Sequence, residues 1–239
     1  MRLFASPQGA IRAVLISQVL LGAGIVFMDM RANPGSAAPG LFAPEDGPGV
    51  RPYRPDLRPA EPGTPAMRPM PKTLEFEEMD GQIRISGQIA VGDADRFASW
   101  MEDTRPTATQ VSLDSSGGSV ADALAIGRTI RGAGFDTLID MGAVCLSACP
   151  YVLAAGVQRQ AMAGAVVGVH QHYFGKNTVL PAFMAVSDVQ RAQASVMDYL
   201  GEMDVDLRLM IHALRTSPDD INVLSPQLMD ELNLTGTNG

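Results

Sequence analysis

Residues 109–131, TQVSLDSSGGSVADALAIGRTIR, place a short strand, a glycine pair and a helix in one continuous stretch. Thr109–Leu113 is typical of a strand, and the run Asp-Ser-Ser-Gly-Gly-Ser follows it. Val120–Arg131 has the apolar spacing of a helix. A strand that leads through a turn into a helix is the building unit of parallel sheets, so the stretch predicts an α/β fold.

Segments on both sides continue this alternation. We expect further strands at Leu74–Glu78, Gln82–Ile89, Phe135–Ile139 and Ala165–Val169. We expect further helices at Asp93–Asp103, Ser147–Ala155, Ser187–Arg215 and Ser225–Glu231, the last with Ser225 as its N-cap. Residues 73–239 are therefore predicted to form one α/β domain with a mostly parallel sheet and helices on its faces.

Residues 32–72 are predicted to be a disordered, extended linker. They hold 11 of the 17 prolines, spaced every three to five residues, and this spacing disfavours helices and sheet ladders.

Residues 1–31 are predicted to direct the chain to a membrane. Ala13–Met28 is an uncharged stretch of 16 residues that follows Arg2 and Arg12. This length lies between a signal-peptide core, about 7–15 residues, and a spanning helix of about 20. We expect an inner-membrane anchor that leaves the domain facing the periplasm, or a signal peptide cleaved near Ser36–Ala38 to give a periplasmic protein. A buried core helix is the remaining interpretation.

The charge distribution excludes one class of partner. Residues 73–239 carry ten Lys/Arg against twenty-one Asp/Glu, and such an acidic domain repels phosphate backbones. We therefore expect no nucleic-acid partner. Two cysteines are too few for a disulfide-dense scaffold or a four-cysteine zinc site.

Three short motifs carry possible chemistry. The run Ser115–Ser119 (SSGGS) has two glycines whose N–H groups could hold an anion, although a Gly-Gly turn alone is more often only a tight turn. Ser147 lies in CLSAC, where it could be a nucleophile or simply the N-cap of a helix. His170 lies in GVHQH directly after a strand and could serve as its base. The nearby His172 suggests a metal, but no carboxylate or cysteine has a convincing ligand spacing, so we expect no metal.

Together the three motifs resemble the ClpP-like serine peptidases, which are the proteolytic subunit of the Clp protease and its relatives. Gly118 precedes Ser147 by 29 residues and His170 follows it by 23, intervals close to those of the family. The resemblance covers Leu74 to Leu234, and CLSAC with Gly-Val-His also resembles an exported branch of these proteins. It implies a ClpP/crotonase-like spiral of β-β-α units with a mostly parallel sheet.

The resemblance also implies residue roles. Ser147 would be the nucleophile and His170 the general base, with the backbone N–H groups of Gly118 and Ala148 as the oxyanion hole. The third triad member would be Asp220 or, as an alternative, Asp219; Asn222 or no residue at all remains open. Phe174–Ser187 would be the substrate-groove region, and an oligomer contact or plain core are equally open interpretations of this segment.

The chain departs from the family in two places. Cys145 and Cys149 flank the nucleophile; they could form a disulfide or remain buried thiols, and a cysteine nucleophile is a further option. The segment that docks an unfoldase is replaced by the anchor and linker. We therefore expect an exported, ATP-independent serine peptidase that hydrolyses peptides or unfolded segments, forms a homo-oligomer and needs no cofactor. The alternatives are an inactive ClpP-fold scaffold and a crotonase-type acyl-thioester enzyme.

Overall fold

The computed structural model describes residues 7–32, 50–52, 54, 69–172 and 182–237. The chain divides into two units, Met1–Ala43 and Pro44–Gly239. The first unit contains helix α1 (Pro7–Ala32), on which large apolar side chains from Ile11 to Leu21 are exposed. Among the described residues, no helix meets the length and hydropathy needed to cross a membrane. The assignment of residues 1–31 to an anchor or a signal peptide stays a prediction.

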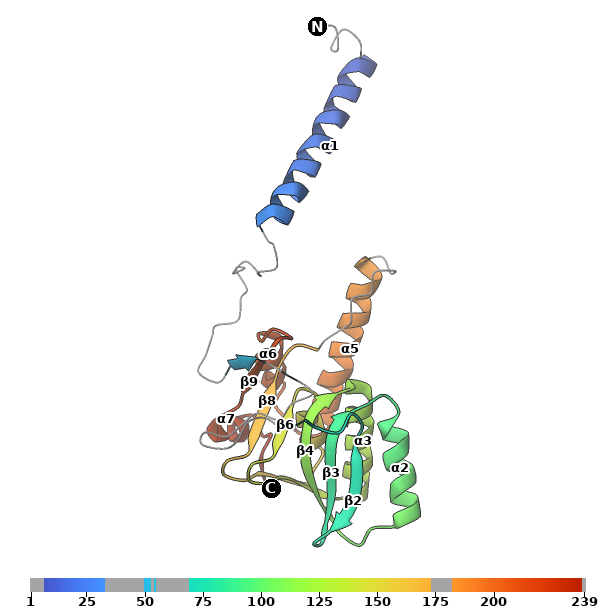
Figure 1. Ribbon diagram of the computed structural model, residues 1–239, viewed down its shortest axis with the longest axis vertical. Helices are drawn as coiled ribbons and strands as arrows, with labels where there is room; N and C mark the ends of the chain where they lie inside the picture. Colours follow the sequence, from blue (N-terminus) through green and yellow to red (C-terminus); the bar gives the residue numbers. More distant parts are fainter. Residues whose placement is uncertain (1–6, 33–49, 53, 55–68, 173–181, 238–239) are drawn as a thin grey trace. The chain divides into compact units, whose positions relative to one another are not determined.

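The second unit is an α/β domain built on a mixed, mostly parallel sheet (Figure 1). Its strands are β1 (Val50–Pro52), β2 (Glu75–Met79), β3 (Gln82–Ile89), β4 (Gln110–Gly118), β5 (Asp136–Ile139), β6 (Val144–Leu146), β7 (Gln158–Ala161), β8 (Val166–Val169), β9 (Asp220–Val223) and β10 (Gly236–Thr237). The predicted α/β class and the mostly parallel sheet are confirmed.

Strand β4 is the branch point of the sheet. One edge pairs in parallel with β3, which also pairs with β2. On the other edge, Gln110–Ser112 pair with β5, whereas Ser115 pairs with β6. β5 continues to β7 and β10, and β6 continues to β8, β9 and β1. Two branches thus diverge from one strand, and the CLSAC and GVHQH motifs both belong to the branch that starts at β6.

The second unit also contains helices. They are α2 (Asp93–Thr104), α3 (Val120–Ala133), α4 (Cys149–Ala154), α5 (Ala182–Glu202), α6 (Arg208–Leu214) and α7 (Pro226–Glu231). α3 begins at Ser119, whose hydroxyl accepts the N–H of Asp122, and ends at Gly134 in the left-handed conformation. It packs against α2 and α4, and α4 in turn contacts β4, β5, β6 and β8. Every residue of α4 is buried.

Strand β4 is longer than predicted. It was expected to end at Leu113, but it continues through the glycine pair because Gly117 and Gly118 pair with Gln88 and Ile89 of β3. Strands β6 and β7 were not predicted, because β6 has only three residues and the sequence of β7, QRQA, has no apolar run.

The single helix predicted at Ser187–Arg215 is two helices. α5 ends at Glu202, and Asp204 adopts a left-handed backbone with φ 55° before α6 begins at Arg208. The break is held by tertiary contacts, since the N–H of Asp206 donates to the carbonyl of Leu232 at 2.9 Å. Apolar spacing continues across the break, so the pattern gave no sign of it. The helix predicted at Ser225–Glu231 is present, and the Ser225 hydroxyl caps it as expected.

Part of the predicted linker belongs to the domain. Residues 50–52 form β1 and pair with β9, so the expectation of an unpaired linker is wrong there. Met70 is buried in a small cluster with Val144, Leu146 and Ile221. The carbonyl of Pro71 accepts the N–H of Gln88 at 2.9 Å. The remaining linker residues, 33–49, 53 and 55–68, lie outside the described residues.

Candidate active site

The topology brings Ser147 and His170 together. Strands β6 and β8 run in parallel, with Leu146 beside Gly168 in register. Ser147 follows directly at the end of β6, and His170 follows β8. Because the carboxyl ends of parallel neighbours meet at one sheet edge, the two side chains converge, and Ser147 Oγ lies 2.7 Å from His170 Nε2.

Gly168 allows this close approach. A Cβ at this position would lie 2.8 Å from the side chain of Ile221 in β9 and 3.1 Å from that of Leu146 in β6. Its carbonyl also accepts the N–H of Ser147 at 2.9 Å. The glycine of the sequence motif therefore holds β6, β8 and β9 close together beneath the serine.

Ser147 has an unusual backbone. Its φ is 61°, in the left-handed region that a residue with a Cβ adopts at a cost of about 1–3 kcal/mol. Such a strained turn between a strand and a helix presents the side chain of its central residue outward. Ser147 is partly exposed, whereas Leu146 and Ala148 on either side are buried. The N-cap of α4 is Ala148, so the interpretation of Ser147 as a capping serine is wrong.

The glycine pair lies against this turn. A Cβ on Gly117, whose φ is 87°, would come within 2.6 Å of Ser147 Cβ and 2.8 Å of the Ala148 nitrogen. A Cβ on Gly118, with φ 145°, would lie 2.1 Å from the carbonyl oxygen of Ile89. Only glycine fits at either position. The SSGGS motif and the CLSAC motif, which begin 30 positions apart, thus form one site.

These contacts suit an oxyanion hole. Ala148 is the N-cap of α4, so its N–H has no acceptor within that helix. The Gly117–Gly118 backbone lies beside it, and the N–H of Gly117 donates to the hydroxyl of Ser115 at 3.1 Å. The motif alone does not indicate this role of Ser115, whose hydroxyl holds the backbone of Gly117 in place.

The surroundings of His170 favour its neutral form. The side chain is buried, and burial lowers its pKa below the ordinary 6.5. The backbone carbonyls of Pro218 and Ser217 act against this shift, as does the negative charge of Asp219. A neutral imidazole beside Ser147 can accept a proton, and the same carbonyls can stabilise the imidazolium that results.

The structure separates the two aspartates proposed for the third position. Asp219 is exposed, and it is the aspartate whose charge raises the pKa of His170. Asp220, the residue favoured by the resemblance, begins β9 and pairs with Pro52 of β1. Both belong to the turn of residues 217–220, in which the N–H of Asp220 donates to the carbonyl of Ser217. The backbone of Ser217 and Pro218, which no sequence motif marks, acts on the imidazole together with Asp219.

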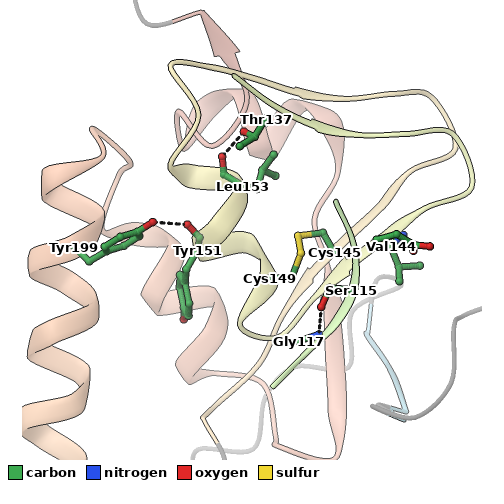
Figure 2. The surroundings of a disulfide bond; sticks show 10 residues. Ser115, Gly117, Thr137, Val144, Cys145, Cys149, Tyr151, Leu153 and Tyr199 are labelled. Carbon is green, nitrogen blue, oxygen red and sulfur yellow. Dashed lines mark hydrogen bonds between the residues drawn. A yellow bond between two sulfur atoms is a disulfide. The ribbon is translucent and has the colours of Figure 1, made fainter. Parts of the chain in front are cut away.

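Cys145 and Cys149 form a disulfide that spans the nucleophile. Their Cα atoms are 5.0 Å apart, and both side chains are buried. Figure 2 shows the bridge joining β6 to the first residue of α4, next to Ser115 and Gly117. Of the two states that the sequence left open, the structure shows the disulfide.

The second histidine is held by α4. His172 Nε2 lies 2.8 Å from the hydroxyl of Tyr151, and the two rings meet edge to face. Burial and the neighbouring His170 lower the pKa of His172 to about 4, so it stays neutral. The described ranges contain no cluster of three or more His, Cys, Asp or Glu side chains able to hold a metal ion. Of the predicted groove at Phe174–Ser187, residues 174–181 lie outside the described residues.

Comparison with known proteins gives no assignment. The chain matches no family model, and no curated protein matches it significantly.

Proposed function

We propose that this chain is an ATP-independent serine peptidase with a ClpP/crotonase-like fold. The observation that carries the proposal is the 2.7 Å contact between Ser147 Oγ and His170 Nε2, made by a serine in the left-handed conformation. A serine needs an adjacent base to become a nucleophile, and this pair provides one. The substrates are peptides or unfolded segments.

The reaction follows from the contacts around the pair. Neutral His170 takes the proton of Ser147 as its oxygen attacks the substrate carbonyl. The N–H groups of Gly118 and Ala148 stabilise the oxyanion, in a loop that packs within contact distance of the serine. The Pro218 and Ser217 carbonyls and Asp219 stabilise the imidazolium. His170 then returns the proton to the leaving amine, and water releases the acyl group.

The sheet supports the proposed spiral. β4 pairs with β5 near its start and with β6 near its end, so successive strand pairs leave it in different directions. The glycine pair and the serine turn meet at the second branch. A ClpP/crotonase-like spiral of β-β-α units accounts for this arrangement.

Export is part of the proposal. The chain has an uncharged stretch at Ala13–Met28 after two arginines, then a proline-rich segment, then the domain. A disulfide persists in an oxidising compartment and is rare in the cytosol. We place the domain outside the cytoplasm, tethered to the membrane or released after cleavage, as a homo-oligomer without a cofactor.

A fluorophosphonate probe tests the activated serine directly. The full-length chain, purified in detergent, is incubated with the probe, and the modified residue is located by mass spectrometry. We expect modification of Ser147, and loss of it in Ser147→Ala and His170→Ala. Ser195→Ala and His212→Ala are the matched controls, because Ser195 is exposed on α5 and His212 lies on α6.

The outcomes separate the candidate functions. Labelling of Ser147 that depends on His170 supports the peptidase and directs the next step to peptide libraries. A folded wild-type chain without labelling contradicts it and leaves the inactive scaffold as the better description.

A further inference from the structure

We propose that the Cys145–Cys149 disulfide positions Ser147, so that acyl transfer requires the oxidised chain. This inference rests on the proposed function and adds redox control to the same site. Its starting point is the position of the bridge, which closes the turn on both sides of the nucleophile.

The bridged turn is the strained part of the site. It contains Leu146, Ser147 and Ala148, and Ser147 has φ 61°. A residue with a Cβ keeps this conformation only when its surroundings impose it. The bridge holds the Cα atoms of Cys145 and Cys149 5.0 Å apart, which limits the ways in which three residues can connect them.

Other contacts hold the remainder of α4. The Tyr199 hydroxyl donates to the carbonyl of Tyr151 at 2.7 Å, and the Thr137 hydroxyl donates to that of Leu153 at 2.6 Å (Figure 2). Arg159 donates to the carbonyl of Ala154 at 3.1 Å. These contacts reach the middle and the end of the helix. The disulfide acts at its first residue, next to the Ala148 N–H of the proposed oxyanion hole.

The loop length argues for a local role. A disulfide stabilises the whole fold mainly by restricting the unfolded chain, and this effect grows with the length of the loop that it closes. Here the cysteines are only four positions apart. The bridge therefore adds less to global stability than one that closes a long loop, while it acts directly on the geometry of the nucleophile.

Reduction of the disulfide removes this restraint on the turn. A dithiol reductant transfers two electrons and two protons to the S–S bond, giving two thiols and the cyclic disulfide of the reductant. Ser147 then relaxes from the left-handed region, and its Oγ moves away from His170 Nε2. Ala148 moves with it, so the base and the oxyanion donor lose their alignment together.

The test measures the labelling of Ser147 in the full-length chain over a range of fluorophosphonate concentrations, with and without dithiothreitol. The maximal rate constant should fall about a hundredfold on reduction, while the concentration for half-maximal rate changes less than about twofold. Re-oxidation should restore the rate. The double variant Cys145→Ala/Cys149→Ala should label slowly in both conditions, and circular dichroism melting monitors folding throughout.

Each result either supports or overturns the positioning role of the disulfide. Slow labelling by a reduced, folded chain, reversed by oxidation, supports the positioning role. Equal labelling of both forms overturns it, and so does loss of the melting transition on reduction, which would make the bridge a global structural element. If the double variant does not fold, the comparison of reduced and oxidised wild type is the test of the positioning role. If the oxidised chain does not label at all, the proposed function fails and this inference fails with it.

Discussion

Single residues make this site through their backbone conformations. Ser147 is left-handed although it carries a Cβ, and Gly117 and Gly118 are left-handed where no side chain fits. The three residues come from two motifs, yet a Cβ on Gly117 would lie within 2.8 Å of atoms in Leu146, Ser147 and Ala148. The site therefore depends on close backbone approach as much as on the Ser147–His170 pair.

Gly117→Ala should disable the site. The new methyl group would lie 2.4 Å from the carbonyl oxygen of Leu146, so the loop or the serine turn must shift. A shift of about 1 Å predicts a fall of about a hundredfold in the probe labelling rate. Gly134→Ala is the matched control: its φ is 71° but a Cβ there meets nothing within 4 Å. It should lose about 1 kcal/mol of unfolding free energy and keep its labelling rate.

The pH dependence of labelling should report the pKa of His170. Only the neutral imidazole accepts the serine proton, so the rate rises with pH through this pKa. Burial lowers the pKa, and the rise should therefore be centred below 6.5. Asp219→Asn removes a charge that raises the pKa and should move the midpoint lower still.

Asp220→Asn is the comparison for that experiment. A midpoint that responds to Asp219 alone assigns the third position to Asp219. A response to Asp220 alone contradicts the assignment from the structure and restores the residue favoured by the family resemblance. A midpoint above 6.5 in the wild type would contradict the dominance of burial.

At the scale of helices and strands, a buried arginine donates hydrogen bonds to backbone carbonyls at or just after the ends of three helices. Arg159 lies in β7 with no exposed surface. It donates to the carbonyls of Ala154 at the end of α4 and Met203 after α5, at 3.1 and 2.9 Å. A third bond of 2.8 Å reaches the carbonyl of Asn233, which follows α7. Burial lowers the pKa of Arg159 to about 10, so it remains charged at neutral pH.

Arg159→Met should therefore destabilise the domain. The methionine keeps much of the apolar volume but removes the donor to the carbonyl of Asn233. The carbonyls of Ala154 and Met203 also lose a bond and keep the one from Arg131. We expect a loss of about 3 kcal/mol or more in the free energy of unfolding, measured by urea denaturation. Arg128→Met is the control, because the pair of Arg128 and Glu202 is about half exposed and should contribute at most about 1 kcal/mol. Equal losses in both variants would contradict the role assigned to Arg159.

Within the second unit, the folded domain begins before residue 73, where the strand and helix pattern of the sequence starts. The notable residues are Met70, which is 8% exposed, and Pro71, whose carbonyl pairs with Gln88. The carbonyl of Thr73 lies so close to Gly87 that a Cβ there would come within 2.5 Å. Residues 69–73 therefore pack along β3 as part of the domain.

Truncation tests this boundary. A chain of residues 69–239 should be more stable than one of residues 73–239 by about 2.5–4 kcal/mol. The difference combines burial of Met70, about 1.5–3 kcal/mol, with one backbone hydrogen bond, about 1 kcal/mol. Urea denaturation of both chains gives the comparison. Equal stabilities would place the start of the domain at residue 73, as the sequence pattern predicts.

The sequence alone determined the class of fold and most of its regular elements. β3 was predicted with its observed bounds because apolar and polar residues alternate along Gln82–Ile89, and the observed burial alternates in the same way. α3 was predicted from its apolar face, and α7 was predicted with Ser225 as its N-cap. Ser147, His170 and the glycine pair were selected from short motifs and their spacing. Signals of this kind are local, so they can be read along one chain.

Only the tertiary structure decided what depends on contacts between distant residues. The strands β1 and β9 exist because they pair with neighbours, and the α5–α6 break is held by Leu232. The disulfide, the left-handed turn at Ser147 and the carbonyls near His170 likewise follow from packing. These features have no period in the sequence, because the energy that fixes each of them comes from atoms far away along the chain.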